Sequence, residues 1–123
     1  MLQEGLTHTS QLIVTEAVSA ISMGSGDLPV LATPAMMALM ENAAMLAVAP
    51  HLPEGSTTVG GHISASHIKP TPIGETVTAT ATVVKVDGKK IEFEVKAYCG
   101  DILLGEGSHL RFIVDREKFM SRL

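Results

Sequence analysis

The stretch from Thr33 to Ala49, TPAMMALMENAAMLAVA, constrains the fold most strongly because it combines helix signals with very little polar surface. Thr33 is a favourable N-cap, Pro34 suits the first helical position, and Pro50 cannot continue the helix. Apolar side chains between these limits cover every direction around the axis, which is typical of a buried helix. The segment is slightly short for a membrane span and has Glu41 at its middle. The sequence therefore predicts a central helix wrapped by a sheet.

Glu41 is the only charged residue in this helix. A carboxylate in an apolar interior needs a charged or hydrogen-bonding partner, or it becomes protonated. One interpretation is a structural carboxylate that is hydrogen-bonded to the backbone or to Asn42. The other is a functional group, which we favour because few structural requirements place a charge in so apolar a helix.

Length and composition limit the classes of protein to consider. The 123 residues predict a single domain, residues 1–123, and the net charge is −4. Nucleic acid is not expected as a partner, because the chain has neither a basic stripe nor a set of stacking aromatic residues. A membrane association is not expected either. The first ten residues do not have the layout of a signal peptide and Cys99 is the only cysteine, so we expect a cytoplasmic protein.

Strand signals surround the helix. β-branched and alternating segments predict strands at residues 7–18, 57–68, 76–85, 91–99 and 102–114. Asp87-Gly88 and Gly100-Asp101 predict tight turns between the last three strands, and the final nine residues predict a short turn or helix. The fold class is therefore α+β, with one long helix on a curved, largely antiparallel sheet of about five strands.

Histidines in the strand at 57–68 lie five residues apart. Alternation places His67 on the apolar face and His62 on the polar face, unless a bulge at Gly60-Gly61 shifts the register. Opposite faces argue against a shared metal, and no metal or other cofactor is expected. We predict that His62 and His109 are surface or rim residues. Cys99 is predicted to be an inert buried thiol.

Several motifs in this layout resemble the fluoroacetyl-CoA thioesterase type of hotdog-fold hydrolase. They are Ala32-Thr33 followed by Leu39-Met40-Glu41, then Ala49-Pro50-His51-Leu52, Gly60 with His67 seven residues on, residues 70–77, residues 105–109, and Glu117-Lys118-Phe119. The resemblance spans nearly the whole chain, and its spacing is more specific than any single motif.

The resemblance implies a hotdog fold and hydrolysis of a small or short-chain acyl-CoA by Thr33, Glu41 and His67, with Gly60 near the thioester oxygen. It also implies a homodimer, or a dimer of dimers, with the acyl site at the subunit interface. One departure concerns the loop before the helix. Fluoroacetyl enzymes carry phenylalanines there, whereas residues 19–31 contain no aromatic residue. Specificity for the fluoroacetyl group is therefore not expected.

Thioester hydrolysis gives each of these groups a role. An oxygen nucleophile must attack the carbonyl, and fixed donors must stabilise the oxyanion. His67 would move protons, Glu41 would orient or charge it, and Thr33 would attack or position water. Thr33 and Glu41 are eight residues apart, which is about 12 Å along a helix. The groups therefore converge only if Thr33 folds back from the loop or if a dimer interface brings them together.

Other interpretations remain open from sequence. Thr33 could serve only as an N-cap, and Gly60 could only permit a bulge. His67 could be a half-buried histidine whose hydrogen bonds are satisfied. Two other classes of hotdog protein also fit the sequence: a dehydratase or hydratase of acyl thioesters, and a non-catalytic module that binds them.

Binding the CoA phosphates requires a cationic patch. The candidate side chains are Lys69, Lys85, Lys89, Lys90 and Arg111.

Overall fold

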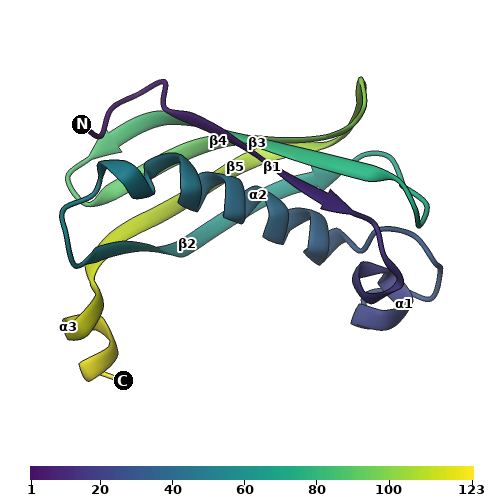
Figure 1. Ribbon diagram of the computed structural model, residues 1–123, viewed down its shortest axis with the longest axis horizontal. Coiled ribbons are helices and arrows are strands. Elements are labelled where there is room, and N and C mark those ends of the chain that lie inside the picture. The colour runs from purple at the N-terminus through teal and green to yellow at the C-terminus, as the bar shows by residue number, and fades with distance from the viewer.

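A computed structural model describes all residues, 1–123, and shows a five-stranded sheet that curls around one long helix (Figure 1). All strand pairs are antiparallel, so the predicted α+β architecture is confirmed. The strands are β1 (Thr7–Ile13), β2 (Ser56–His67), β3 (Thr76–Asp87), β4 (Lys90–Cys99) and β5 (Ile102–Asp115). The helices are α1 (Ala20–Met23), α2 (Thr33–Val48) and α3 (Arg116–Ser121), with 3₁₀ turns at Glu16–Val18 and Ala49–His51.

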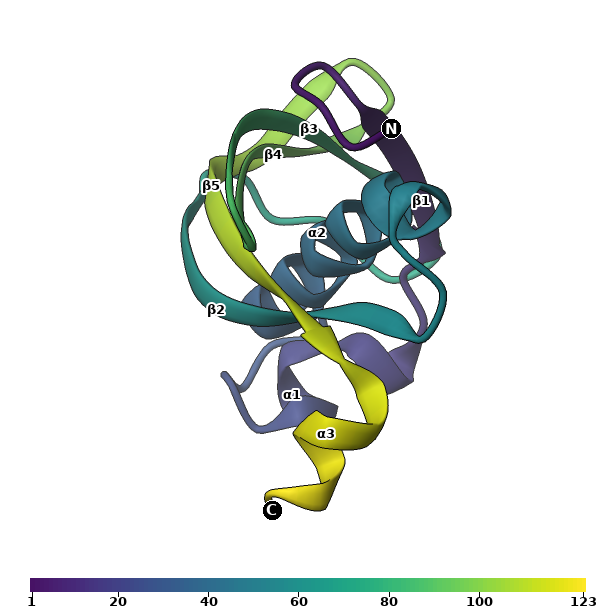
Figure 2. The same cartoon turned by 90° about the vertical axis from the view of Figure 1, so that its left-hand side faces the viewer.

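The sheet has the strand order β1-β3-β4-β5-β2, which leaves β1 and β2 at its two edges. Viewed from one end, the strands curve round one side of α2 and leave its other side open (Figure 2). Alternate residues of β3 and β4 point into this concave face. These residues are Val77, Ala79, Ala81, Val83, Ile91, Phe93, Val95 and Ala97, and all of them are buried.

Only one face of α2 is buried in the chain. The buried side chains recur at helical spacing and are Ala35, Met36, Leu39, Met40, Ala43, Ala44, Ala47 and Val48. On the opposite face Ala38 and Asn42 are exposed, and Leu46 retains 39% of its accessible surface. The prediction that α2 is buried all round, with Glu41 in an apolar interior, is therefore wrong for the single chain. Five strands cover one side of the helix, and its outer side, which carries Asn42 among apolar residues, remains uncovered.

The start of α2 differs from the predicted one by a residue. Ala32 occupies the N-cap position without a side-chain cap, and Thr33 is the first helical residue. The backbone before it is fixed by neighbouring segments, because Leu31 N–H donates to the Thr71 carbonyl and Ala32 N–H donates to the Val18 carbonyl. The N-cap interpretation of Thr33 is therefore wrong, and its hydroxyl is available for another contact.

The ends of the chain show one shortened element and one confirmed element. The strand predicted at 7–18 ends at Ile13, since Val14 turns into the core and a 3₁₀ turn follows. The short C-terminal helix is present as α3. Asp115 caps it by accepting a hydrogen bond of 3.0 Å from Lys118 N–H. None of the helices is long and apolar enough to cross a membrane.

A β-bulge in β2 sets the orientation of the residues that matter for the site. The register with β5 shifts between Gly60 and His62, so Gly61 is the extra residue. Without the shift, Gly60 and His67 would face opposite sides of the sheet, since they are seven residues apart. With it, both face α2. The bulge that the sequence left open is therefore present.

Candidate functional site

Thr33 and His67 form the first half of the site. Thr33 lies at the beginning of α2 and His67 at the end of β2, and the Thr33 Oγ1 to His67 Nδ1 distance is 2.7 Å. The two residues line a cavity of about 280 Å³. Its other lining residues come from α1, the following loop and the end of β2: Ala20, Ser25, Val30, Leu31, Ile68, Lys69 and Pro70.

The surroundings of His67 favour its neutral form. Burial lowers the pKa of His67, and a smaller contribution from the backbone of Lys69 opposes this shift. Its Nε2 is buried and has no hydrogen-bond partner, so Nδ1 is the ring nitrogen that meets the Thr33 hydroxyl at the cavity. A neutral imidazole beside a hydroxyl is the arrangement expected of a general base and the group it deprotonates.

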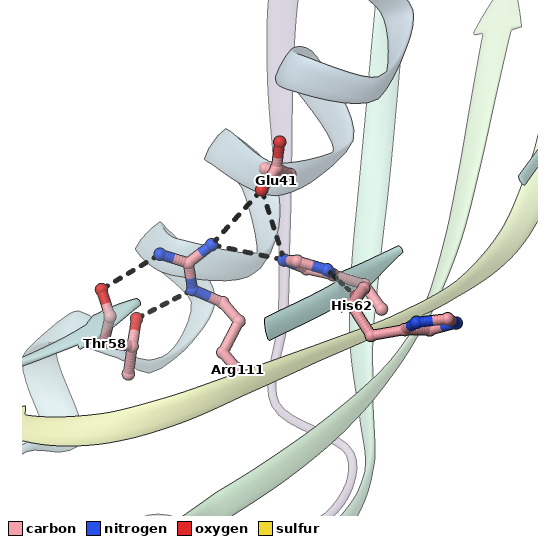
Figure 3. A network of polar contacts seen from close by, with 5 residues as sticks. Glu41, Thr58, His62 and Arg111 are labelled. Carbon is pink, nitrogen blue, oxygen red and sulfur yellow. Dashed lines mark hydrogen bonds and ion pairs between the residues drawn. The ribbon is translucent and has the colours of Figure 1, made fainter. Parts of the chain in front are cut away.

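Glu41 and Gly60 form a second group, farther along α2. A methyl group built on Gly60 would lie 2.9 Å from Glu41 Oε2, so the strand backbone and the carboxylate are in close approach. Glu41 is 42% exposed at its side chain, and its Oε2 lies 3.9 Å from a guanidinium nitrogen, Nη1, of Arg111 (Figure 3). A larger residue at position 60 would displace the carboxylate.

Arg111 is held behind Glu41 by buried contacts. It is 7% exposed, and its Nε and Nη2 donate to Thr58 Oγ1 and to the Thr58 carbonyl at 2.8 and 3.0 Å (Figure 3). Burial lowers the pKa of Arg111, while the charge of Glu41 raises it. Arg111 is therefore a structural neighbour of Glu41. The prediction that it contributes to a cationic patch for the CoA phosphates is wrong.

His109 adjoins the same group and contradicts the sequence prediction. It is 2% exposed, whereas a surface or rim position was expected. Residues 105, 107, 109 and 111 share the inward face of β5, but the first two are glycines and give no apolar signal. Leu104, immediately before Gly105, is also buried. Strict alternation counted from Leu104 would therefore place His109 on the outer face. His62 is exposed, as predicted.

The four predicted site residues thus form two pairs within the chain. Thr33 meets His67, and Glu41 meets Gly60. Eight residues of α2, about 12 Å, separate Thr33 from Glu41, and no hydrogen bond or ion pair joins the two groups. Thr33 therefore does not fold back from the loop toward Glu41.

Two further residues singled out from the sequence can be placed. Cys99 is half-buried rather than buried, because a register shift after Ala97 interrupts the apolar face of β4, and its Sγ lies 3.8 Å from a carboxylate oxygen of Glu75. Lys85 is paired with Glu92 at 4.0 Å. No group of three or more His, Cys, Asp or Glu side chains is arranged to hold a metal ion.

Comparison with known proteins identifies the family. A profile of the fluoroacetyl-CoA-specific thioesterases matches residues 14–117. The chain belongs to this family. The fluoroacetyl-CoA thioesterase of Streptantibioticus cattleyicolor is 38% identical over 94 residues, which are 76% of this chain and 68% of that protein.

Solved structures extend the likeness to the fold. A threonine-to-serine variant of the fluoroacetyl-CoA thioesterase, in complex with acetyl-CoA, is 30% identical, with 98% of this chain and 96% of that chain covered and a TM-score of 0.93. A hot-dog-like protein from Thermanaerovibrio acidaminovorans is 22% identical, with 98% and 90% covered and a TM-score of 0.88. The predicted hotdog fold is confirmed.

The half-buried His67 and the buried His109 predict a pH dependence of stability. Burial lowers the pKa of both His67 and His109, so the unfolded chain binds more protons than the folded chain below the ordinary histidine pKa of about 6.5. The free energy of unfolding should therefore fall as the pH is lowered through about 6.5. Urea unfolding of the wild type and of His67→Gln at several pH values measures this. The variant should show a shallower fall, and equal slopes would contradict the assignment for His67.

Proposed function

We propose that this protein hydrolyses small or short-chain acyl-CoA thioesters to the free acid and CoA, at a site shared by two subunits of a homodimer. Thr33 and His67 come from one subunit, and Glu41 and Gly60 come from its partner. The observation that carries the proposal is the 2.7 Å contact between the Thr33 hydroxyl and His67 Nδ1 at the cavity. Membership of a thioesterase family supports the reaction class.

The chemistry begins at the Thr33 hydroxyl. Neutral His67 accepts a proton at Nδ1 while an oxygen, either that hydroxyl or a water held by it, attacks the thioester carbonyl carbon. The tetrahedral intermediate then expels the CoA thiolate, which takes up the proton. If Thr33 attacks directly, water hydrolyses the resulting ester in a second cycle. In both cases one water and one thioester give one acid and one thiol.

The edge position of β2 supports a shared site. An edge strand presents unpaired backbone groups, and a second copy can satisfy them by antiparallel pairing about a two-fold axis. Opposed residues in such a pair must point to the same face. With the axis at Ser64, Ser64 opposes itself and His62 opposes Ser66. The bulge residues Gly60 and Gly61 then oppose His67 of the partner.

This register would bring the two half-sites together. Gly60 is in close approach to Glu41 within one chain. A register that places Gly60 beside the partner's His67 would therefore also bring the Glu41 carboxylate near that histidine. Because His67 Nε2 is turned into its own chain, Glu41 would approach the pair from the Thr33 side. There it would orient the attacking oxygen, and the Gly60 backbone would stabilise the oxyanion.

The cavity favours a small acyl group. Its volume is about 280 Å³, and its lining includes Lys69 and several aliphatic residues but no phenylalanine, tyrosine or tryptophan. The phenylalanine lid expected of a fluoroacetyl enzyme is therefore missing from residues 19–31. We propose a short aliphatic acyl group as the substrate, and we keep the sequence-based prediction of a cytoplasmic protein.

Thiol release from a panel of acyl-CoAs tests the reaction. Wild-type protein should release CoA thiol from short-chain acyl-CoAs, and Thr33→Val should lower kcat by about 100-fold or more because it removes the hydroxyl and keeps the shape. Thr33→Ser is the matched control and should retain most of the activity. Acyl-CoA binding without thiol release by the wild type would instead support a binding module, and full turnover by Thr33→Val would exclude Thr33 from the chemistry.

A disulfide across the two-fold axis tests the register. In a Cys99→Ser background, Ser64→Cys should form an intersubunit disulfide on mild oxidation, because opposed residues in antiparallel strands have Cα atoms about 4.5–5.5 Å apart. Ser66→Cys is the control, since its two copies would be about 13 Å apart. Non-reducing electrophoresis measures the dimer formed. Equal cross-linking of the two variants, or a monomeric wild type in sedimentation, would contradict the register.

A further inference from the structure

We infer that His109 is a positioning residue: as a neutral imidazole it holds the Arg111 guanidinium beside Glu41. The inference has two parts. The contacts of His109 are observed within the single chain, whereas its effect on catalysis rests on the role proposed above for Glu41.

The Nδ1 atom of His109 must carry a proton. His109 Nδ1 lies 2.7 Å from the backbone carbonyl oxygen of His62. A carbonyl oxygen only accepts hydrogen bonds, so Nδ1–H is the donor. This contact ties the ring to β2 at the residue that follows the bulge.

The Nε2 atom of His109 must lack a proton. His109 Nε2 lies 3.2 Å from Arg111 Nη1, and a guanidinium has donors but no acceptor. Nε2 therefore accepts from Arg111, and the two contacts together require the neutral Nδ1–H tautomer. The 3.9 Å approach of His109 Nε2 to Glu41 Oε2 is then not an ion pair, because the nitrogen presents a lone pair to the carboxylate.

The surroundings of His109 agree with a neutral ring. Burial lowers the pKa of His109; the His62 carbonyl opposes this, the positive charge of Arg111 lowers the pKa further, and Glu41 and His62 add smaller effects of opposite sign. From β4, the ring of Phe93 packs against it with centroids 6.0 Å apart and contributes no charge. Protonation of Nε2 would replace a hydrogen bond by repulsion between two buried cations.

Arg111 is consequently fixed on three sides. Thr58 accepts from Nε and Nη2, and His109 accepts from Nη1, so the guanidinium plane cannot rotate away from α2. Its remaining charge is directed at Glu41 at 3.9 Å, a distance that stabilises the carboxylate without a direct hydrogen bond. The Glu41 oxygens accept no hydrogen bond from Arg111 and keep their lone pairs for the reacting groups.

Two substitutions separate the contacts of His109. His109→Gln places an amide oxygen near the position of Nε2 and can still accept from Arg111, whereas His109→Asn reaches only the position of Nδ1. We expect His109→Asn to lower kcat by about 10-fold or more, the scale of a lost hydrogen bond to a charged group, with little change in KM. His109→Gln should remain within about threefold of the wild type. Urea unfolding checks that both variants are folded. Equal kcat values for the two variants would overturn the positioning role.

Nitrogen NMR of histidine-labelled protein tests the tautomer without using the reaction. His109, assigned by its loss in His109→Gln, should show the neutral Nδ1–H pattern at neutral pH, and it should become protonated only below the ordinary histidine pKa of about 6.5. An imidazolium pattern for His109 at neutral pH, or the Nε2–H tautomer, would contradict the inference. If the wild type released no thiol from any acyl-CoA, the proposed function would fail, whereas the NMR result would still decide the contacts of His109.

Discussion

The contact between the Thr33 hydroxyl and His67 Nδ1 joins the first turn of α2 to the last residue of β2, and the arrangement of the site depends on it. Two local constraints make it possible. The helix begins one residue earlier than its cap signals indicate, because Leu31 and Ala32 are bonded to neighbouring segments. The bulge at Gly61 then turns the end of β2 so that His67 faces the helix.

The same helix and strand carry the second half of the site. Glu41 lies two turns farther along α2, and Gly60 lies on the other side of the bulge. A straight helix keeps these groups about 12 Å from Thr33, so one chain alone cannot unite them. The uncovered edge of β2 offers the route by which a second copy would supply the missing half. Catalysis would then require assembly.

Much of this was predictable from local patterns. The extent of α2 follows from its flanking prolines, and the hairpin between β3 and β4 follows from Asp87-Gly88. The close approach of Thr33 and His67 was expected from the family resemblance. Glu41 was placed wrongly because a helical apolar pattern does not show how far the sheet curls round the helix. His109 and Arg111 were missed because their inward-facing neighbours on β5 are glycines.

The central claim is that each site takes Thr33 and His67 from one subunit and Glu41 from the other, and hybrid dimers test it most directly. Thr33→Val and Glu41→Gln homodimers should both be nearly inactive. A hybrid purified through a different tag on each chain would contain one site with both defects and one intact site, so it should recover about half of the wild-type activity. A hybrid as inactive as its parents would show that each chain supplies its own Thr33 and Glu41, and would contradict the account.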